Sequence, residues 1–497
     1  MISAFPGGSR YRLLVAALAV AMVIQLLFAL VIAKGNPAYF GHYHAQIHPD
    51  AQHYMVLAEN FWEGRGFSRM DAPPYQPDAL RTPGYIAVAG PLWLSARMVW
   101  PLYLFNALCH LITAVLVYRM AAAFLGHKAA LAAAAFFALD LMLASLVFET
   151  MTEPFFNLLW VLGAVLFLEG FPRFRNGKGG AMRLAGAGAV LGFAVLVRPA
   201  GLYIPLVLAA AAAVTPRTRK EAVNTARAMA LFLPAALLVM IPWMARNQKT
   251  FGIFRLSTVD AINMVYYAGA GPYQLEYGLS LPEAQKRISQ DYHLASNWEY
   301  HNPWNTGKTI RQLDEEIRAV TRPVLLRDVP RLALATLIGV SRSAFAHTAD
   351  NFSEMAGRAW VSPGMGNLAH GKWGEFAKRL RLNPAWSVAV FAIELMQACL
   401  LWPLFLIGCA GLGWRFLRGH RFSGMPLLLC AYFLATMGAG GMDATARFRA
   451  SILPLAYVLA AQGALYVGSM LRRGSREKRA GDTLEGGNPV GSAAGFN

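Results

Sequence analysis

Apolar runs long enough to cross a membrane recur along the sequence, and they limit the fold more than any other feature. A transmembrane helix needs about 20 predominantly apolar residues, and only helices or closed barrels satisfy their backbone hydrogen bonds within lipid. With 56% hydrophobic and 14% charged residues, the chain has lipid as its main solvent. We therefore expect an all-α, polytopic transmembrane helix bundle. The clearest runs span residues 13–33, 129–147, 155–168, 228–243, 386–412 and 451–470.

The formal net charge of +18 is concentrated in short segments between these runs. This is the positive-inside pattern, which indicates membrane topology and gives no reason to expect nucleic-acid binding. Alternation from the basic loops predicts about ten spans, seven of them before residues 245–385 and three after. Within 83–125, Pro91 and Pro101 predict a short membrane-dipping helix followed by one full span. A further crossing there, or at 331–345, would bring the total to about 11 or 12.

The same alternation divides the chain into six segments. In order, we expect a first span, a first outer loop, a transmembrane core, an outer segment with short helices, the C-terminal spans and a disordered cytoplasmic tail. Ser280 and Glu283 have capping-box spacing, which favours helices in the outer segment. The six segments cover residues 1–33, 34–82, 83–244, 245–385, 386–470 and 471–497.

Polar residues that alternation assigns to the outer side are scattered along the sequence but share one membrane face. Charge at the end of an apolar helix is costly unless it is paired or hydrated. For any one of these residues, an ordinary solvated loop is an equal explanation. Together, carboxylates and arginines on one face indicate an anionic ligand at the membrane surface. The set comprises Asp50, His53, Tyr54, Asp71, Asp78, Arg81, Glu149, Glu153, Arg198, Arg246, Asn247, Asp443, Arg447 and Arg449.

Several stretches resemble the GT-C superfamily of membrane glycosyltransferases, in particular bacterial enzymes similar to protein O-mannosyltransferases and aminoarabinose transferases. The stretches include "AENFWEGRGF", "RTPGYIAVAGPL", "FETMTEPFFNLL", "IPWMARNQKTFG" and "ARFRASILPLAYVLAAQG". The resemblance implies a multi-span fold with an acidic catalytic residue in its first outer loop. It also implies a polyprenyl-phosphate-linked sugar donor, a lipid, glycan or protein acceptor, and a site on the extracytoplasmic face of a bacterial inner membrane.

Asp50 occupies the place of the acidic residue in that loop. A carboxylate there would act as general base on the acceptor hydroxyl during a single inverting displacement. The alternative is a helix cap, because Pro49-Asp50 opens a stretch that reads as helix. Some family members have an acidic pair here, but Ala51 follows Asp50, so only one carboxylate is available.

The resemblance assigns Arg81 of "RTPGY" to the lipid phosphate, which a guanidinium binds through two parallel hydrogen bonds. Other candidates for phosphate binding are His53, three residues after Asp50, and Arg246, Arg447 and Arg449, for which contacts with lipid headgroups are the alternative.

Glu149 and Glu153 are four residues apart, so a helical turn here would put both on one face. Some relatives use a divalent cation, and Glu149 and Glu153 with Asp50 could hold it here, although helix capping also explains Glu153. Arg198 would reach an outer cavity or snorkel, and Tyr54 is a further site candidate. No other cofactor is expected.

The competing hypothesis is a transporter or flippase of lipid-linked or anionic substrates. Such proteins usually show repeated halves and ionisable groups near mid-membrane. Here the two halves do not match, and the charged groups cluster at one face. Asp140 is the exception, and we expect it to be a relay or an interhelical partner.

Overall fold

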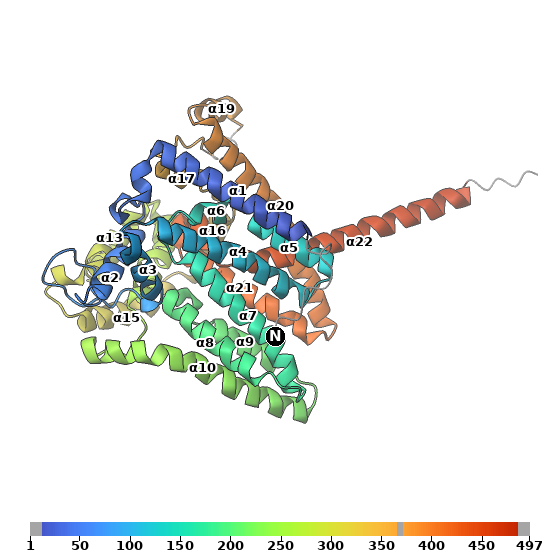
Figure 1. The fold of residues 1–497 in the computed structure, drawn as a ribbon, viewed down its shortest axis with the longest axis horizontal. Coiled ribbons are helices and arrows are strands. Elements are labelled where there is room, and N and C mark those ends of the chain that lie inside the picture. The colour runs from blue at the N-terminus through green and yellow to red at the C-terminus, as the bar shows by residue number, and fades with distance from the viewer. Residues whose placement is uncertain (1–11, 365–370, 486–497) are drawn as a thin grey trace, which may run out of the picture.

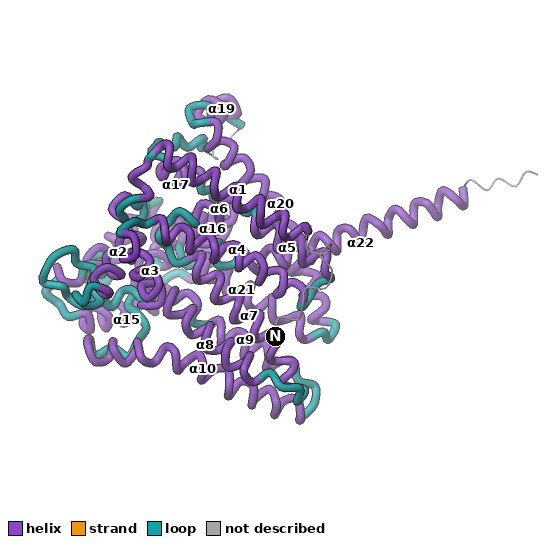
Figure 2. Tube along the Cα trace, in the orientation of Figure 1, coloured by secondary structure: helices purple, strands orange, loops and turns teal. Residues whose placement is uncertain are grey.

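The computed structural model describes residues 12–364 and 371–485, and helices are the main secondary structure within these ranges. Helices account for 77% of the structure, and the described residues form no strand (Figure 2). The predicted all-α class is therefore confirmed.

The long helices form one bundle. Helix α10 packs against α8, α8 against α7, α7 against α4, and α20 against α22. Six described helices are long and apolar enough to span a membrane: α1, α4, α7, α10, α20 and α22. The full number of spans stays a prediction. The bundle helices are α1 (Arg12–Gly35), α3 (Pro83–Ala96), α4 (Trp100–Ala122), α5 (His127–Ala138), α6 (Leu141–Leu146), α7 (Glu153–Arg175), α8 (Ala181–Val197), α9 (Ile204–Ala213), α10 (Arg219–Phe251), α20 (Ala385–Leu417), α21 (Gly424–Gly438) and α22 (Leu453–Glu485).

Asp140 divides the apolar run 129–147 into the two helices α5 and α6. Its side chain caps α6 by accepting a hydrogen bond from the amide of Leu143 at 3.0 Å. The hydroxyl of Tyr457 on α22 donates to the other carboxylate oxygen at 2.7 Å. Asp140 is thus an interhelical partner, the second of the two roles expected for it.

Residues 245–385 form short helices with a separate hydrophobic core. Ile262, Tyr266, Leu313 and Ile317 are buried there together with Leu80 from the first loop. The predicted capping box of Ser280 and Glu283 is present at the start of α13. The helices are α11 (Val259–Asn263), α12 (Ala270–Tyr277), α13 (Leu281–Asp291), α14 (Asn297–His301), α15 (Ile310–Leu326), α16 (Val329–Phe345), α17 (Ala349–Met355) and α19 (Trp373–Leu380).

The two ends of the bundle differ. Helix α2 (Pro49–Trp62) lies with α3, α13 and α15 at one end, and α22 projects beyond the other (Figure 1). We call these the α2 end and the basic end, because the basic loops after α4, α7, α9 and α20 meet at the latter.

The structure corrects the C-terminal boundary. The sequence predicted a disordered tail from residue 471, but α22 continues as helix to Glu485. The rest of that predicted tail, 486–497, lies outside the described residues.

Candidate active site

Asp50 lies in the first turn of α2, where Pro49 starts the helix and His48, not Asp50, is the N-cap residue. Its carboxylate is bound from two sides. Arg81 donates to Oδ1, and Nη2 of Arg447 donates to Oδ2 at 2.9 Å. The Asp50 side chain is 33% exposed, so it remains accessible while it is paired.

Arg447 links Asp50 to a second, fully buried carboxylate. Its Nε lies 2.9 Å from Oε1 of Glu153 at the start of α7, and Nη1 of Arg198 lies 2.5 Å from the same oxygen. Arg447 comes from the turn η8 (Ala446–Arg449) before α22. The network therefore joins the first loop, the α7 and α8 helices and the C-terminal part of the bundle.

Arg81 is held in place by its neighbours in the first loop. Oδ1 of Asp78 accepts hydrogen bonds from the amides of Leu80 and Arg81 at 2.9 and 3.0 Å. The guanidinium carbon lies 5.0 Å from the ring centre of Tyr54, and Nη2 lies 3.4 Å from Nδ1 of His53. Asp78 thus fixes the backbone of Arg81, while Tyr54 and His53, both predicted site candidates, lie beside its guanidinium.

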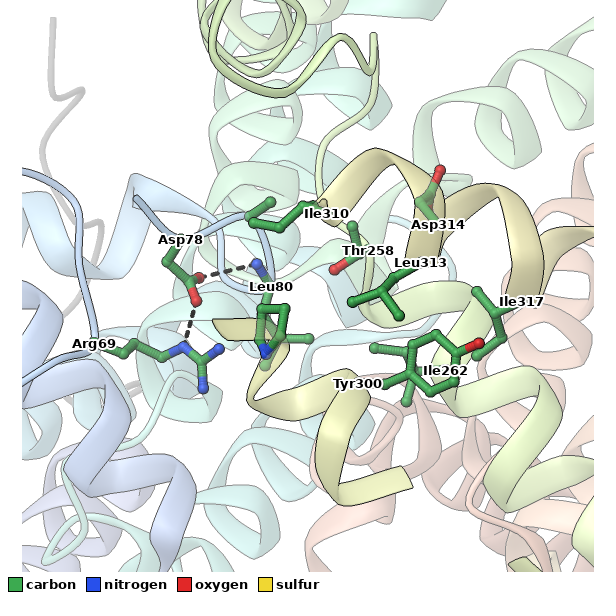
Figure 3. Close-up of a pocket in the computed structure, with 12 residues that line it drawn as sticks. Arg69, Asp78, Leu80, Thr258, Ile262, Tyr300, Ile310, Leu313, Asp314 and Ile317 are labelled. Atoms are coloured by element: carbon green, nitrogen blue, oxygen red, sulfur yellow. Dashed lines mark hydrogen bonds and ion pairs between the residues drawn. The ribbon is translucent and has the colours of Figure 1, made fainter. Parts of the chain in front are cut away.

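Asp78 is itself fixed by Arg69, as Figure 3 shows. Arg69 also donates to the carbonyl of His301 at 2.8 Å, which ties the first loop to α14. The cavity drawn there measures only about 20 Å³, room for little more than one water molecule. Asp78 and Arg69 therefore support Arg81 and do not form a substrate pocket.

A second acid–base pair lies beside Asp50. Nε2 of His48 is 3.4 Å from Oε2 of Glu149 and 3.1 Å from Nδ2 of Asn351. Glu149 is buried, and its Oε1 has no hydrogen-bond partner among the described residues.

Asp50 and the residues around it line a large cavity at the α2 end. Its volume is about 740 Å³. One wall comes from the first loop and η8, and the other from α13 and α14. The polar lining residues include His48, Asp50, His53, Arg447, Lys286, Asn297 and His301.

The local charges shift the pKa values of Asp50, His53 and His48 in different ways. Burial alone would raise the pKa of Asp50, but the charges of Arg81 and Arg447 hold it well below its usual range. Burial, with Arg69 and Arg81, lowers the pKa of His53 to about 4, so His53 is neutral near pH 7. Burial would also lower the pKa of His48, but Glu149 outweighs it and the pKa is raised.

Two predicted phosphate ligands are not brought to Asp50. Arg246 donates to the carbonyl of Asp78 and to Asn247, both at 2.9 Å, and stacks near Trp243. Arg449 is buried and donates to the carbonyls of Ser343 and Ala344 at the end of α16.

The residues do not fit the divalent cation considered for Asp50, Glu149 and Glu153. Helix α7 begins only at Glu153, so Glu149 does not share a helical turn with it and instead pairs with His48. Arg447 lies between the carboxylates of Asp50 and Glu153, and Glu153 also binds Arg198. Within the described part of the chain, no group of three or more His, Cys, Asp or Glu side chains is arranged to hold a metal.

Residues 89–245 match the family model described as dolichyl-phosphate-mannose-protein mannosyltransferase. The match confirms the resemblance to GT-C glycosyltransferases. It supports a membrane glycosyltransferase and gives no support to the transporter alternative. No curated protein matches the sequence.

Solved structures similar to this chain include an archaeal oligosaccharyltransferase, AglB from Archaeoglobus fulgidus, in complex with an inhibitory peptide and a dolichol-phosphate. It is 16% identical with a TM-score of 0.47, and the similarity covers 96% of this chain and 52% of that one. The apo form of the oligosaccharyltransferase from the same organism is 15% identical with a TM-score of 0.48, covering 95% and 53%. This chain thus spans about half the length of those proteins. The inhibitory peptide and the dolichol-phosphate are ligands of the archaeal protein.

Sequence reasoning missed His48 and Arg69. His48 stands directly before the predicted helix start, and Arg69 lies in a loop among other polar residues. Neither carries a signal in one sequence, because their roles depend on Glu149 and His301, which are distant along the chain.

Proposed function

We propose that this GT-C glycosyltransferase transfers a sugar from a polyprenyl-phosphate donor to an acceptor on the extracytoplasmic face of a bacterial inner membrane. The observation that carries the proposal is a single accessible carboxylate between two arginines at the rim of a large cavity. A carboxylate suits proton removal from an acceptor hydroxyl, and guanidinium groups suit a lipid phosphate leaving group.

The pairing of Asp50 gives the proposed reaction an order. While both arginines bind Asp50, its depressed pKa makes it a weak base. A donor phosphate that binds Arg81 and Arg447 competes with Asp50 for the same donors. Asp50 then gains basicity at the moment the donor is in place. The acceptor oxygen attacks the anomeric carbon, Asp50 takes its proton, and the phosphate leaves with the bonding electrons.

The experiment compares envelope lipids and glycans by mass spectrometry in cells that lack the protein and express wild type, Asp50→Asn or Asp71→Asn. Asp71 is an exposed carboxylate of the same loop and provides the matched control. We expect loss of one glycan modification and accumulation of its lipid-linked sugar in the deletion and in Asp50→Asn, but not in Asp71→Asn.

Membrane levels of each variant are measured in parallel, so that loss of protein is distinguished from loss of activity. Unchanged glycans in the deletion would contradict the proposed transfer. Near-wild-type transfer by Asp50→Asn would contradict only the assignment of the base.

A further inference from the structure

A second large cavity opens at the basic end of the bundle, opposite the site of Asp50. Its volume is about 440 Å³. It lies where the ends of α4, α7 and α20 meet the start of α10 and the loop before α21. Its charged and titratable lining residues are Arg175, Arg217, Glu221, Arg415, His420 and Arg421.

The walls of this basic cavity are fixed by bonds within the protein. Arg217 donates to the carbonyl of Gly419 at 2.9 Å, and Arg421 donates to that of Pro216 at 2.7 Å. These reciprocal bonds join the loop before α10 to the loop before α21. Nη1 of Arg175 donates to Oγ1 of Thr215 at 3.0 Å. The cavity therefore lies between loops that hydrogen bonds hold in fixed positions relative to each other.

The arginines that line the cavity carry more hydrogen-bond donors than the protein satisfies. Each guanidinium carries five N–H groups, so the bonds to carbonyls leave most donors of Arg217 and Arg421 available. Four arginines face a single glutamate, whose carboxylate accepts from the backbone amide of Arg217 at 2.8 Å. An anion with several oxygens would satisfy this arrangement.

Two general effects account for positive charge at this end but not for its convergence. Arginine is favoured near helix C-termini by the helix dipole, and basic loops follow from membrane topology. Neither effect requires arginines from four separate segments to line one cavity.

Apolar side chains next to the cavity indicate that the anion has a lipid tail. Trp414 is 57% exposed and Leu417 is 78% exposed, and they flank Arg415 near the end of the apolar helix α20. Such residues are stable when lipid covers them, which places the cavity at the level of the headgroups. We propose that the basic cavity binds the phosphate of an anionic membrane lipid.

The test uses the purified full-length protein in detergent and measures its melting temperature against added ligand. The probes are phosphatidylglycerol, zwitterionic phosphatidylcholine and inorganic phosphate. Arg415→Glu places a repelling charge in the cavity, while Arg173→Glu makes the same change at an exposed arginine near the end of α7 that is not part of the lining. Arg415→Gln is measured as well, so that a folding failure of Arg415→Glu still leaves a readout.

We expect phosphatidylglycerol to stabilise wild type more than either other probe. One basic residue in contact with an anionic headgroup is worth about 1 kcal/mol, or roughly fivefold in affinity. The two Arg415 variants should lose at least that factor, and Arg173→Glu, outside the cavity, clearly less. Equal stabilisation by both lipids, or equal losses in Arg415→Glu and Arg173→Glu, would overturn the proposal. Stabilisation by inorganic phosphate equal to that by phosphatidylglycerol would overturn its lipid part.

Discussion

Arg81 and Arg447 hold Asp50 through donors that a phosphate also accepts from. Arg81 reaches the carboxylate from the same loop, 31 residues along the chain, whereas Arg447 is 397 residues away. The charge of the ligand-free cluster is therefore largely balanced, and an incoming phosphate must replace one carboxylate. The proposed mechanism depends on this exchange of a carboxylate for a phosphate. Each of the two arginines can therefore be tested by substituting it alone.

Arg81→Gln removes the cation while retaining some hydrogen bonding. Loss of one positioned donor to a leaving group typically costs about 3 kcal/mol of transition-state stabilisation, which corresponds to roughly a hundredfold in kcat/KM. We expect that loss with purified protein and lipid-linked sugar. Arg97→Gln, at an exposed arginine that pairs with Glu63, serves as control and should stay within about threefold of wild type. A small effect at Arg81 would exclude it as the phosphate ligand.

The pair of His48 and Glu149 should make the thermal stability of the protein depend on pH. Because Glu149 raises the pKa of His48 above about 6.5, the pair stabilises the folded state fully below that pH and progressively less as pH rises through the raised pKa. The melting temperature of wild type should therefore exceed that of His48→Gln most at about pH 6 and least at about pH 8.5. A difference that grows with pH would contradict the ion pair. His53→Gln should show no such trend over this range, since the pKa of His53 is about 4.

The turn η8 shows what one sequence predicts about an element and what it does not. Arg447 and Arg449 carry the same signal, a basic residue before the last span, and both were predicted to bind phosphate. The short turn directs Arg447 toward Asp50 and Arg449 toward the carbonyls that end α16. The sequence therefore located the polar face and the helices. The direction of each side chain depended on tertiary packing that periodicity does not encode.

These two arginines should respond in opposite ways to the same substitution. Arg449→Met leaves buried carbonyls of α16 without a donor, so we expect a loss of about 2 kcal/mol in stability with activity per folded molecule retained. Arg447→Met should abolish transfer. Thermal stability and transfer rate, both normalised to folded protein, separate the two outcomes, and equal loss of activity in both variants would contradict this division of roles.

At the scale of the whole molecule, the C-terminal helices close the bundle through glycines. A Cβ on Gly408 would lie 1.9 Å from the carbonyl oxygen of Leu459, and one on Gly463 would lie 2.0 Å from that of Leu404. Helices α20 and α22 therefore pack backbone to backbone, as small residues allow within membranes. Because α22 follows η8 directly, this contact also helps to place Arg447.

Gly463→Ala should force α20 and α22 apart. We expect a stability loss of about 2 kcal/mol from the backbone clash, together with reduced transfer. Gly413→Ala on α20 is the control, because a Cβ there meets no atom within 4 Å. Thermal unfolding in detergent and transfer assays check both variants. Equal melting temperatures of the two variants would show that the helices can separate without a loss of stability.

The position of Arg447 also sets when during synthesis the site is completed. Asp50 and Arg81 emerge from the ribosome early, whereas Arg447 follows only after α21 has been made. A partly synthesised chain can hold the first loop in its final place and still lack the second cation. Under the proposed mechanism, nascent chains are therefore inert toward the donor until almost the entire bundle has been inserted.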